Sequence, residues 1–302
     1  MGIRQAAEAL ETCEGITFSR DVPLAPYTTY RIGGPADLMV CADTYTGLTR
    51  ALRIVNDERV PWVLLGRGSN VLVSDAGYRG CVIRLGREFQ KLEVDGSIIC
   101  AGAALQLTKL VNETLTQELS GLECCAGVPG TVGGAVSMDA GTRHEWIGSC
   151  IRDVVCLKPG QGMKRYAGTD IEWGYRWCSI PSDEIILEAT FQLKPSTKKR
   201  VADDMNLRMA RRRATQPAGR CCGSVFRNPG DRSVGALLES CGVKGMRAGG
   251  ACVSDKHANF ILNEGNATAT DVLRLIQAMH GAVKEKYDIE LMPEVKFLGF
   301  DE

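Results

Sequence analysis

The sequence has no excess of charge, few aromatic residues and no long apolar run. Its 36 Lys and Arg residues balance its 36 Asp and Glu residues, so it lacks the positive surface expected of a protein that binds nucleic acid or an anionic membrane. Aromatic residues make up only 6% of the chain, which argues against a platform for stacking bases. Apolar runs such as Pro61–Leu65 are far too short to span a bilayer. We therefore expect no nucleic-acid partner and no membrane partner.

The first residues of the chain also lack targeting features. The segment MGIRQAAEALETCEG contains no apolar core of a secretory signal. Ala6 stands where a myristoylation signal requires Ser or Thr. The sequence therefore predicts a cytoplasmic protein.

Metal-binding patterns are missing although cysteine is abundant. The chain has 13 Cys residues, an odd number, and no C-x-x-C motif. The three histidines, His144, His257 and His280, lie at no metal-ligand spacing from a cysteine pair. This pattern favours reduced thiols that pack as small buried hydrophobes over a metal site or a disulfide framework, and we expect no metal.

Apolar spacing in the first half predicts mixed helices and strands. Residues 43–60 carry a helical stripe behind a cap at Asp43 or Thr44, and Gly121 is expected to end a second helix. Asp95 and Gly96 form the usual dipeptide of a tight hairpin. The expected helices are 43–60 and 105–121, and the expected strands are 61–66, the two flanks of residues 95–96, 152–157 and 184–193.

The polar, proline-containing stretch 194–200 indicates a domain boundary, and 302 residues suggest two or three domains. Beyond it, Thr268 and Asp271 are spaced as the capping box of a long amphipathic helix. The expected elements are helices over 201–217, 233–242 and 268–287 and a strand within 290–299. The predicted organisation is an N-terminal helical segment 1–26, a domain 27–195 and a domain 201–302.

Two glycine-rich loops indicate a ligand held by backbone groups. Gly66–Asn70, GRGSN, begins like a dinucleotide fingerprint, but Val71 stands where the third glycine belongs and more strand follows. A simple tight turn explains this loop equally well. Gly127–Gly134, GVPGTVGG, is a second loop whose backbone can approach a ligand closely. Two such loops without lysine favour the diphosphate of a dinucleotide cofactor.

At this point the sequence resembles the UDP-N-acetylenolpyruvoylglucosamine reductase family, within the wider superfamily of FAD-linked oxidases. The resemblance runs from about Tyr27 to Gly299. It rests on these blocks, in order: TTYRIGGPAD, LGRGSNVLVSDAGYRGCVI, AGVPGTVGGAV, GYRWCSIP, TQP, GSVFRNPG, GGACVSDKHANFILN and PEVKFLG. Their order and spread make it specific.

The resemblance implies an α+β fold. Two subdomains over 27–195 would bind FAD, and a smaller α+β domain over 201–302 would bind the substrate. The residues that it places near FAD are Tyr30, Arg31, Gly66, Arg67, Gly68, Ser69, Asn70, Gly127, Val128, Pro129, Gly130, Thr131, Gly133, Gly134, Ala140 and Gly141.

The implied reaction is the NADPH-dependent reduction of an enolpyruvyl ether on a UDP-sugar to a lactyl ether by way of FAD, in peptidoglycan precursor synthesis. By resemblance, Arg176 stabilises charge on the carboxylate, Ser224 donates a proton to carbon, and Glu294 shares the first role or orients a donor. The partner would be a small-molecule UDP-sugar, and we expect a monomer.

Each of these three residues has a plain structural explanation as well. Arg176 could stack among neighbouring aromatic rings, Glu294 could be an exposed strand residue, and Ser224 could form a turn. Ser224 fits poorly as a hydrolase nucleophile because Phe226 stands where a nucleophile elbow has its second glycine; His257 nevertheless leaves a base available.

The resemblance also implies residues that contact the substrate. For Arg213 a plain explanation exists as well, because a positive charge in the last turn of a helix interacts favourably with the helix dipole. The positions concerned are Tyr175, Arg213, Gln216, Arg227, Asn228, His257 and Asn259. The chain has no room between Arg176 and Ser224 for the inserted tyrosine loop of the family's longer form, so it resembles the shorter class. Asp139 stands where a neutral residue is expected.

Two other functions remain open at this level. An FAD-linked oxidase that acts on a small alcohol would share the glycine loops, but not the set of Arg176, Ser224 and Glu294. A nucleotide-sensing module without catalytic activity could have kept the loops alone.

Overall fold

The structure, a computed structural model, describes residues 2–300. The chain divides into two compact units, each assembled from separate segments. The first unit contains residues 2–20, 38–66 and 80–211, and the second contains 21–37, 67–79 and 212–300. This division differs from the expected single boundary near residues 194–200. The functional limits 27–195 and 201–302 stay a prediction.

The N-terminal segment is only partly helical. Helix α1 covers Gly2–Glu11, but residues that were expected to be helical then form strand β1, Ile16–Pro23. Helix α2, Tyr45–Asp57, begins at Thr44, whose side chain accepts a hydrogen bond from the Gly47 N–H at 3.0 Å. The cap expected at Asp43 or Thr44 is therefore Thr44.

These helices share an apolar core with a four-stranded sheet. Its order is β1-β2-β5-β3, and β3 runs parallel to β5. The remaining strands are β2, Pro35–Ala42, β3, Trp62–Leu64, and β5, Tyr78–Leu85. Leu48, Leu52 and Val55 of α2 are buried, which confirms the stripe predicted for residues 43–60. Ala7 and Leu10 of α1 are buried in the same core.

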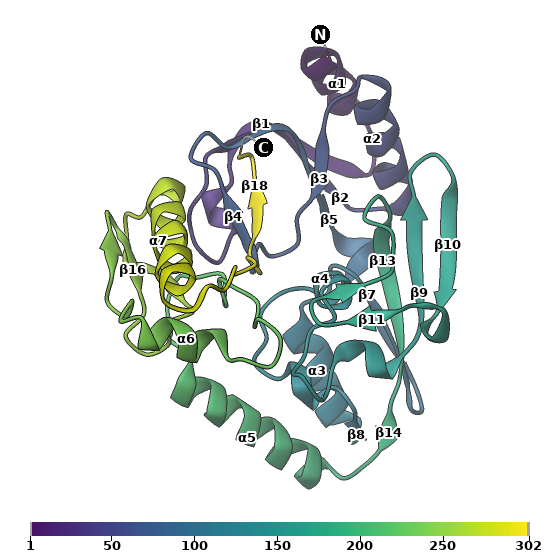
Figure 1. Cartoon of the computed structure of the whole chain (residues 1–302). Coiled ribbons are helices and arrows are strands. Elements are labelled where there is room, and N and C mark those ends of the chain that lie inside the picture. Colours follow the sequence, from purple (N-terminus) through teal and green to yellow (C-terminus); the bar gives the residue numbers. More distant parts are fainter. Residues whose placement is uncertain (1, 301–302) are drawn as a thin grey trace. The chain divides into compact units, whose positions relative to one another are not determined.

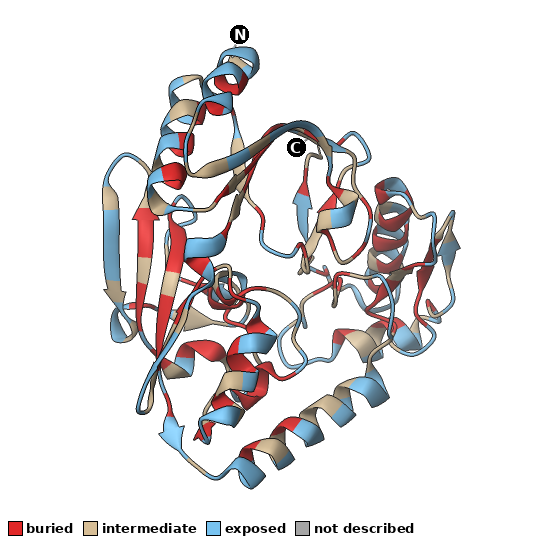
Figure 2. Ribbon diagram, turned by 180° about the vertical axis from the view of Figure 1, so that it is seen from behind, coloured by how far each residue is buried: buried red, intermediate tan, exposed pale blue. Residues whose placement is uncertain are grey.

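A second sheet in the first unit is antiparallel, with the order β10-β9-β13-β7-β6. Figure 2 shows the interior strands β9 and β13 largely in red and the edge strand β10 mostly exposed. Gly96, at φ +58°, turns β6 into β7 as predicted. The strands are β6, Leu92–Asp95, β7, Ile98–Gly102, β9, Ile151–Lys158, β10, Gly162–Ala167, and β13, Ile185–Gln192.

Helices α3, Leu107–Thr116, and α4, Val132–Ser137, share a core with this sheet. Helix α3 ends earlier than expected, because Glu118, at φ +56°, reverses the chain. Gly121 directly follows β8, Leu119–Ser120. Strand β8 pairs with β14, Lys194–Pro195. The expected link therefore includes a short strand, after which α5, Lys198–Thr215, begins.

The second unit contains α6, Val234–Ser240, and α7, Ala269–Tyr287, with two small sheets (Figure 1). The predicted capping box of Thr268 and Asp271 begins α7. The Asp75 carboxylate adds hydrogen bonds from the Ala269 and Thr270 N–H groups at 2.7 and 2.9 Å. The strands are β4, Val71–Val73, β15, Arg247–Ala248, β16, Ala251–Val253, β17, Ile261–Asn263, and β18, Lys296–Leu298.

Strand β18 pairs in parallel with β4, although the two lie in distant parts of the sequence. Tyr30, Ile32 and Leu72 join the core formed by α6 and α7. The second unit therefore depends on segments from both halves of the chain.

The cysteines are buried or half-buried free thiols. Burial raises the pKa of Cys81, for example, to about 12. Both observations agree with the packing role expected for thiols. Within residues 2–300, no helix combines the length and apolarity that a membrane crossing needs.

Candidate functional site

Arg176 lies at the tip of a tight hairpin in the first unit. Strands β11, Trp173–Gly174, and β12, Trp177–Cys178, pair so that Tyr175 and Arg176 form the two-residue turn. Arg176 has φ +62°, a region that favours glycine or asparagine. Its guanidinium lies 4.9 Å from the Tyr175 ring centroid, and its Nη1 donates to the Gly141 carbonyl at 3.5 Å. The stacking on an aromatic ring that was expected of a purely structural arginine is therefore present. Arg176 also makes a polar contact, the hydrogen bond to Gly141.

A buried carboxyl lies near this hairpin. Asp139 is only 5% exposed and has φ +41°. Its Oδ1 accepts a hydrogen bond from the Gly148 N–H at 3.1 Å. Burial raises the pKa of Asp139 to about 6, and this rise is opposed by the Gly148 hydrogen bond and by the charge of Arg176. Asp139 and Arg176 therefore interact electrostatically.

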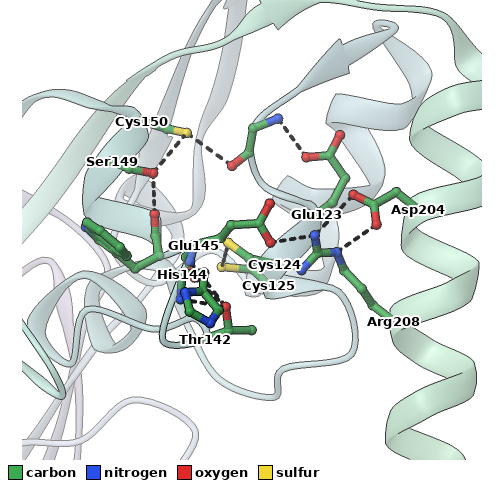
Figure 3. Close-up of polar contacts among 12 residues, drawn as sticks. Glu123, Cys124, Cys125, Thr142, His144, Glu145, Ser149, Cys150, Asp204 and Arg208 are labelled. Atoms are coloured by element: carbon green, nitrogen blue, oxygen red, sulfur yellow. Dashed lines mark hydrogen bonds and ion pairs between the residues drawn. The ribbon is translucent and has the colours of Figure 1, made fainter.

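The loop that follows Asp139 is fixed to α5. Figure 3 shows Arg208 of α5 between Glu145 and Asp204, with ion-pair distances of 2.5 and 3.0 Å. The Thr142 hydroxyl accepts hydrogen bonds from the N–H groups of His144 and Glu145 at 3.3 and 3.2 Å. The Glu145 carboxylate is therefore directed to Arg208.

The two glycine-rich loops meet in the first unit. A Cβ atom at Gly66 would lie 3.0 Å from the Thr131 hydroxyl oxygen, and one at Gly133 would lie 2.8 Å from the Ala103 Cβ. Thr131 caps α4 by accepting a hydrogen bond from the Gly134 N–H at 3.3 Å. Glycine at positions 66 and 133 therefore lets these backbone segments pack closely against Thr131 and Ala103. That the two loops hold the diphosphate of a dinucleotide stays a prediction.

The other half of the GRGSN loop contacts the TTYRIGG block within the second unit. Gly68 has φ +58°, and a Cβ atom there would lie 2.6 Å from the Tyr27 carbonyl oxygen. The Gly68 carbonyl accepts a hydrogen bond from the Thr29 N–H at 3.2 Å. The Tyr30 hydroxyl lies beside the Cys222 thiol and has no nitrogen or oxygen partner among the described residues. Two sequence blocks that were expected to bind one cofactor are therefore neighbours.

Ser224 and Glu294 are close together in the second unit. The Glu294 N–H donates to the carbonyl of Val225, the residue after Ser224, at 2.7 Å. Ser224 is half-buried, and the chain before it turns at Gly223, which has φ +83°. A Cβ atom at Gly223 would meet nothing within 4 Å. This glycine is therefore required by its backbone angle.

Two asparagines hold this serine loop in place. The side chain of Asn259 is 2% exposed; it accepts from the Phe226 N–H at 3.0 Å and donates to the Phe226 carbonyl at 2.9 Å. Asn70 donates to the Glu294 carbonyl at 2.9 Å. Sequence reasoning placed Asn259 at the substrate and Asn70 at the cofactor and missed both positioning roles. The sequence offered no signal for these roles except the residue type, because the hydrogen-bond partners of both asparagines lie far away in the sequence.

The remaining substrate candidates have varied surroundings in the second unit. Asn228 accepts a hydrogen bond from the Val234 N–H at 3.0 Å and so supports the start of α6. His257 accepts from the Asn259 N–H at 3.2 Å, and burial lowers its pKa. The Arg213 carbonyl accepts from Lys256 at 2.5 Å. The buried Nε of Arg227 has no hydrogen-bond partner in the described part of the chain.

The site residues named from the sequence divide between the units. The first unit contains Gly66, Gly127, Val128, Pro129, Gly130, Thr131, Gly133, Gly134, Ala140, Gly141, Tyr175 and Arg176. The second contains Tyr30, Arg31, Arg67, Gly68, Ser69, Asn70, Arg213, Gln216, Ser224, Arg227, Asn228, His257, Asn259 and Glu294. The structure thus brings together Gly66 with Thr131, Gly68 with the segment before Tyr30, and Ser224 with Glu294.

Family models match two parts of this chain. Residues 36–158 match an FAD binding domain. Residues 215–298 match the C-terminal domain of UDP-N-acetylenolpyruvoylglucosamine reductase.

Whole relatives cover nearly the full length. UDP-N-acetylenolpyruvoylglucosamine reductase 1 of Bacillus cereus is 40% identical over 280 residues, which are 92% of this chain and 93% of that protein. The reductase of Halalkalibacterium halodurans is 37% identical and covers 98% of this chain and 99% of its own. The crystal structure of the reductase from Thermus caldophilus superposes with a TM-score of 0.83 at 35% identity, covering 94% of this chain and 99% of that one.

Proposed function

Because the chain belongs to the UDP-N-acetylenolpyruvoylglucosamine reductase family and is therefore an FAD-dependent oxidoreductase of peptidoglycan synthesis, we propose which of its residues carry the reaction. The assigned set is Arg176, Ser224 and Glu294. The observation that supports the assignment is the hydrogen bond between the Glu294 N–H and the carbonyl of Val225, the residue next to Ser224.

Bound FAD would supply the hydride for the substrate. We propose that NADPH first delivers this hydride to FAD. Hydride added to the enolpyruvyl carbon remote from the carboxylate leaves negative charge on the neighbouring carbon and on the carboxylate. The Arg176 guanidinium cannot lose its proton, so its task is to bind and stabilise that carboxylate. The left-handed backbone of Arg176 supports this role, because a strained position is kept where its side chain is needed.

Ser224 completes the reduction in this proposal by giving its hydroxyl proton to the charged carbon. A serine is a weak acid, but a carbanion is a strong base, so a well-placed hydroxyl is sufficient. The double contact of Asn259 with Phe226 and the turn at Gly223 hold the serine loop. In this proposal, the Glu294 side chain orients a hydrogen-bond donor toward the substrate carboxylate.

The two glycine-rich loops, which meet where Gly66 packs against Thr131, are proposed to hold the FAD diphosphate through backbone N–H groups. The Gly133 N–H is not one of these groups, because it donates to the Ala103 carbonyl at 2.9 Å. The unpartnered Nε of Arg227 supports a contact with the UDP-sugar in the second unit. We further propose that the protein works as a monomer in the cytoplasm.

An anaerobic flavin titration tests the function. The yellow protein should bleach with NADPH and recolour when the enolpyruvyl UDP-sugar is added. A protein that bleaches but fails to recolour contradicts the proposed substrate. Rapid reoxidation by oxygen with release of peroxide, and none by the UDP-sugar, would instead indicate an oxidase of small alcohols.

Replacing the serine tests the proton donor. Ser224→Ala should leave bleaching nearly unchanged and slow recolouring by about 10²–10⁴-fold, because only the second step needs a proton on carbon. Ser240→Ala, at the end of α6, is the matched control and should alter neither step. Equal slowing of both steps by Ser224→Ala would rule out this role.

A further inference from the structure

Asp139 is a buried carboxyl that the proposed chemistry does not use. It follows the end of α4 at Ser137 and is 5% exposed. One hydrogen bond, from the Gly148 N–H, reaches its Oδ1. A buried carboxylate normally needs several donors or a cation to offset its lost hydration. The electrostatic partner of Asp139 is the guanidinium of Arg176.

Three elements surround this carboxyl. A Cβ atom at Gly148 would lie 2.9 Å from the Asp139 Oδ1 and 2.3 Å from the Trp173 ring, so both groups pack against Gly148. The Cys178 thiol donates to the Ser137 carbonyl at 3.8 Å, which joins β12 to the end of α4. Arg176 and Cys178, both on the hairpin, interact electrostatically with Asp139.

The charge of Asp139 changes within the ordinary pH range. Burial is the main reason that its pKa lies at about 6. An arginine side chain carries a positive charge throughout this range. Arg176 therefore has a neutral neighbour at pH 5 and an anionic neighbour at pH 7.5.

We propose that Asp139 is a positioning residue that acts through Arg176: its carboxylate competes with the substrate carboxylate for the guanidinium, so the substrate binds and reacts better when Asp139 is protonated. This inference rests on the proposed role of Arg176. It predicts that Asp139, which is not one of the three proposed catalytic residues, controls how much of the positive charge of Arg176 is available to the substrate carboxylate.

The competition has a thermodynamic signature. Two carboxylates that share one guanidinium repel each other, so the bound substrate strengthens proton binding by Asp139. A coupling of about one pKa unit corresponds to about tenfold in affinity. Substrate binding near pH 6.5 is then accompanied by proton uptake.

The first test follows the pH profile of the FAD-loaded enzyme. For the recolouring step, kcat/KM of the wild type should fall about tenfold between pH 5 and pH 7.5. In Asp139→Asn, which keeps the acceptor for Gly148 and tolerates a positive φ, this fall should disappear while bleaching by NADPH is unchanged. Glu145→Gln is the control: it removes a carboxylate from the same loop that pairs with Arg208, and it should keep the fall.

A profile that is unchanged in Asp139→Asn would overturn the proposal. So would an equal change in bleaching, because the carboxylate would then act on the flavin and not through Arg176.

The second test needs no substrate and so separates this inference from the proposed function. The Asp139 carboxyl carbon can be titrated by ¹³C NMR in the FAD-loaded protein. Its midpoint should lie near pH 6 and should rise in Arg176→Gln, because the favourable charge is removed. An unchanged midpoint would refute the coupling, even if the enzyme reduces the UDP-sugar. A raised midpoint in a protein that fails to recolour would support the coupling and contradict the function.

Discussion

At the scale of single residues, Arg176 occupies a backbone position that favours glycine. Its φ of +62° lies at the second residue of a two-residue turn. An L-residue other than glycine pays about 1–2 kcal/mol for such a conformation. The fold therefore retains this arginine at some loss of stability, as expected when the side chain has a task.

Arg176→Gly separates the two effects. At pH 5, where Asp139 is largely protonated and does not need the Arg176 charge, relief of the backbone strain and the added freedom of glycine in the unfolded chain nearly cancel, so the free energy of unfolding should change by less than about 1 kcal/mol. Recolouring should fall by at least about 10²-fold. The control is Glu118→Gly, since Glu118 has φ +56° in the same unit; it should spare recolouring. A normal rate of recolouring in Arg176→Gly would contradict the proposed role of Arg176 in stabilising the substrate carboxylate.

Asp139 should make the first unit less stable as pH rises. Its pKa is about 6 in the folded protein and about 3.9 in the unfolded chain. Between these values the folded state binds more protons, so the free energy of unfolding falls by about 2–3 kcal/mol from pH 4 to pH 7.

Asp139→Asn should abolish this loss. Chemical denaturation should show the variant more stable than the wild type by about 2 kcal/mol at pH 7.5, with little difference at pH 4. Asp183→Asn, which replaces an exposed carboxylate, should show no such dependence. A constant difference at both pH values would mean that the Asp139 pKa is not raised.

The sequence predicted residue types better than residue tasks. Ser224 and Glu294 were expected at one site, and they are neighbours. Asn259 and Asn70 were expected to face ligands, yet each holds backbone of the serine loop or of Glu294. An amide side chain serves either purpose equally well, and only the distant partner decides between them.

At the scale of elements, local signals predicted what local contacts determine. Thr44 and the box of Thr268 and Asp271 cap their helices as expected. The end of α3 was missed because Glu118 takes the left-handed position expected of a glycine. Strands of two or three residues, such as β8 and β14, were missed because so short a segment shows no periodicity.

The serine loop depends on one buried amide. Asn259→Ala would leave the Phe226 N–H and carbonyl without partners, which should lower the free energy of unfolding by about 2–4 kcal/mol. Recolouring should slow more than bleaching, because the loop carries Ser224. Thermal unfolding and the two flavin steps measure these effects. Asn112→Ala, on the exposed side of α3, is the control. A similarly small loss of unfolding free energy in both variants would refute the role of Asn259 in holding the serine loop.

At the scale of the whole molecule, the chain enters and leaves each unit several times. Composition predicted a boundary near residues 194–200, but this stretch lies within the first unit, and composition could not show that residues 21–37 and 67–79 belong with 212–300. That grouping comes from long-range pairs such as β4 with β18. Sequence composition contains no signal for pairs of this kind.

A fragment of residues 201–302 should therefore not fold by itself. It would lack β4, the partner of β18, and the core residues Tyr30, Ile32 and Leu72. The expected result is poor dispersion in a ¹H–¹⁵N NMR spectrum and no cooperative thermal transition, whereas the full chain shows both. A fragment with a cooperative transition would show that the early segments are dispensable.

The pairing of β4 with β18 also has a consequence during synthesis on the ribosome. Residues 71–73 are made about 220 residues before residues 296–298, an interval on the order of 10–45 s at roughly 5–20 residues per second. Throughout that time the apolar Val71, Leu72 and Val73 have no strand partner from β18. The nascent chain should therefore bind chaperones until its last strand emerges.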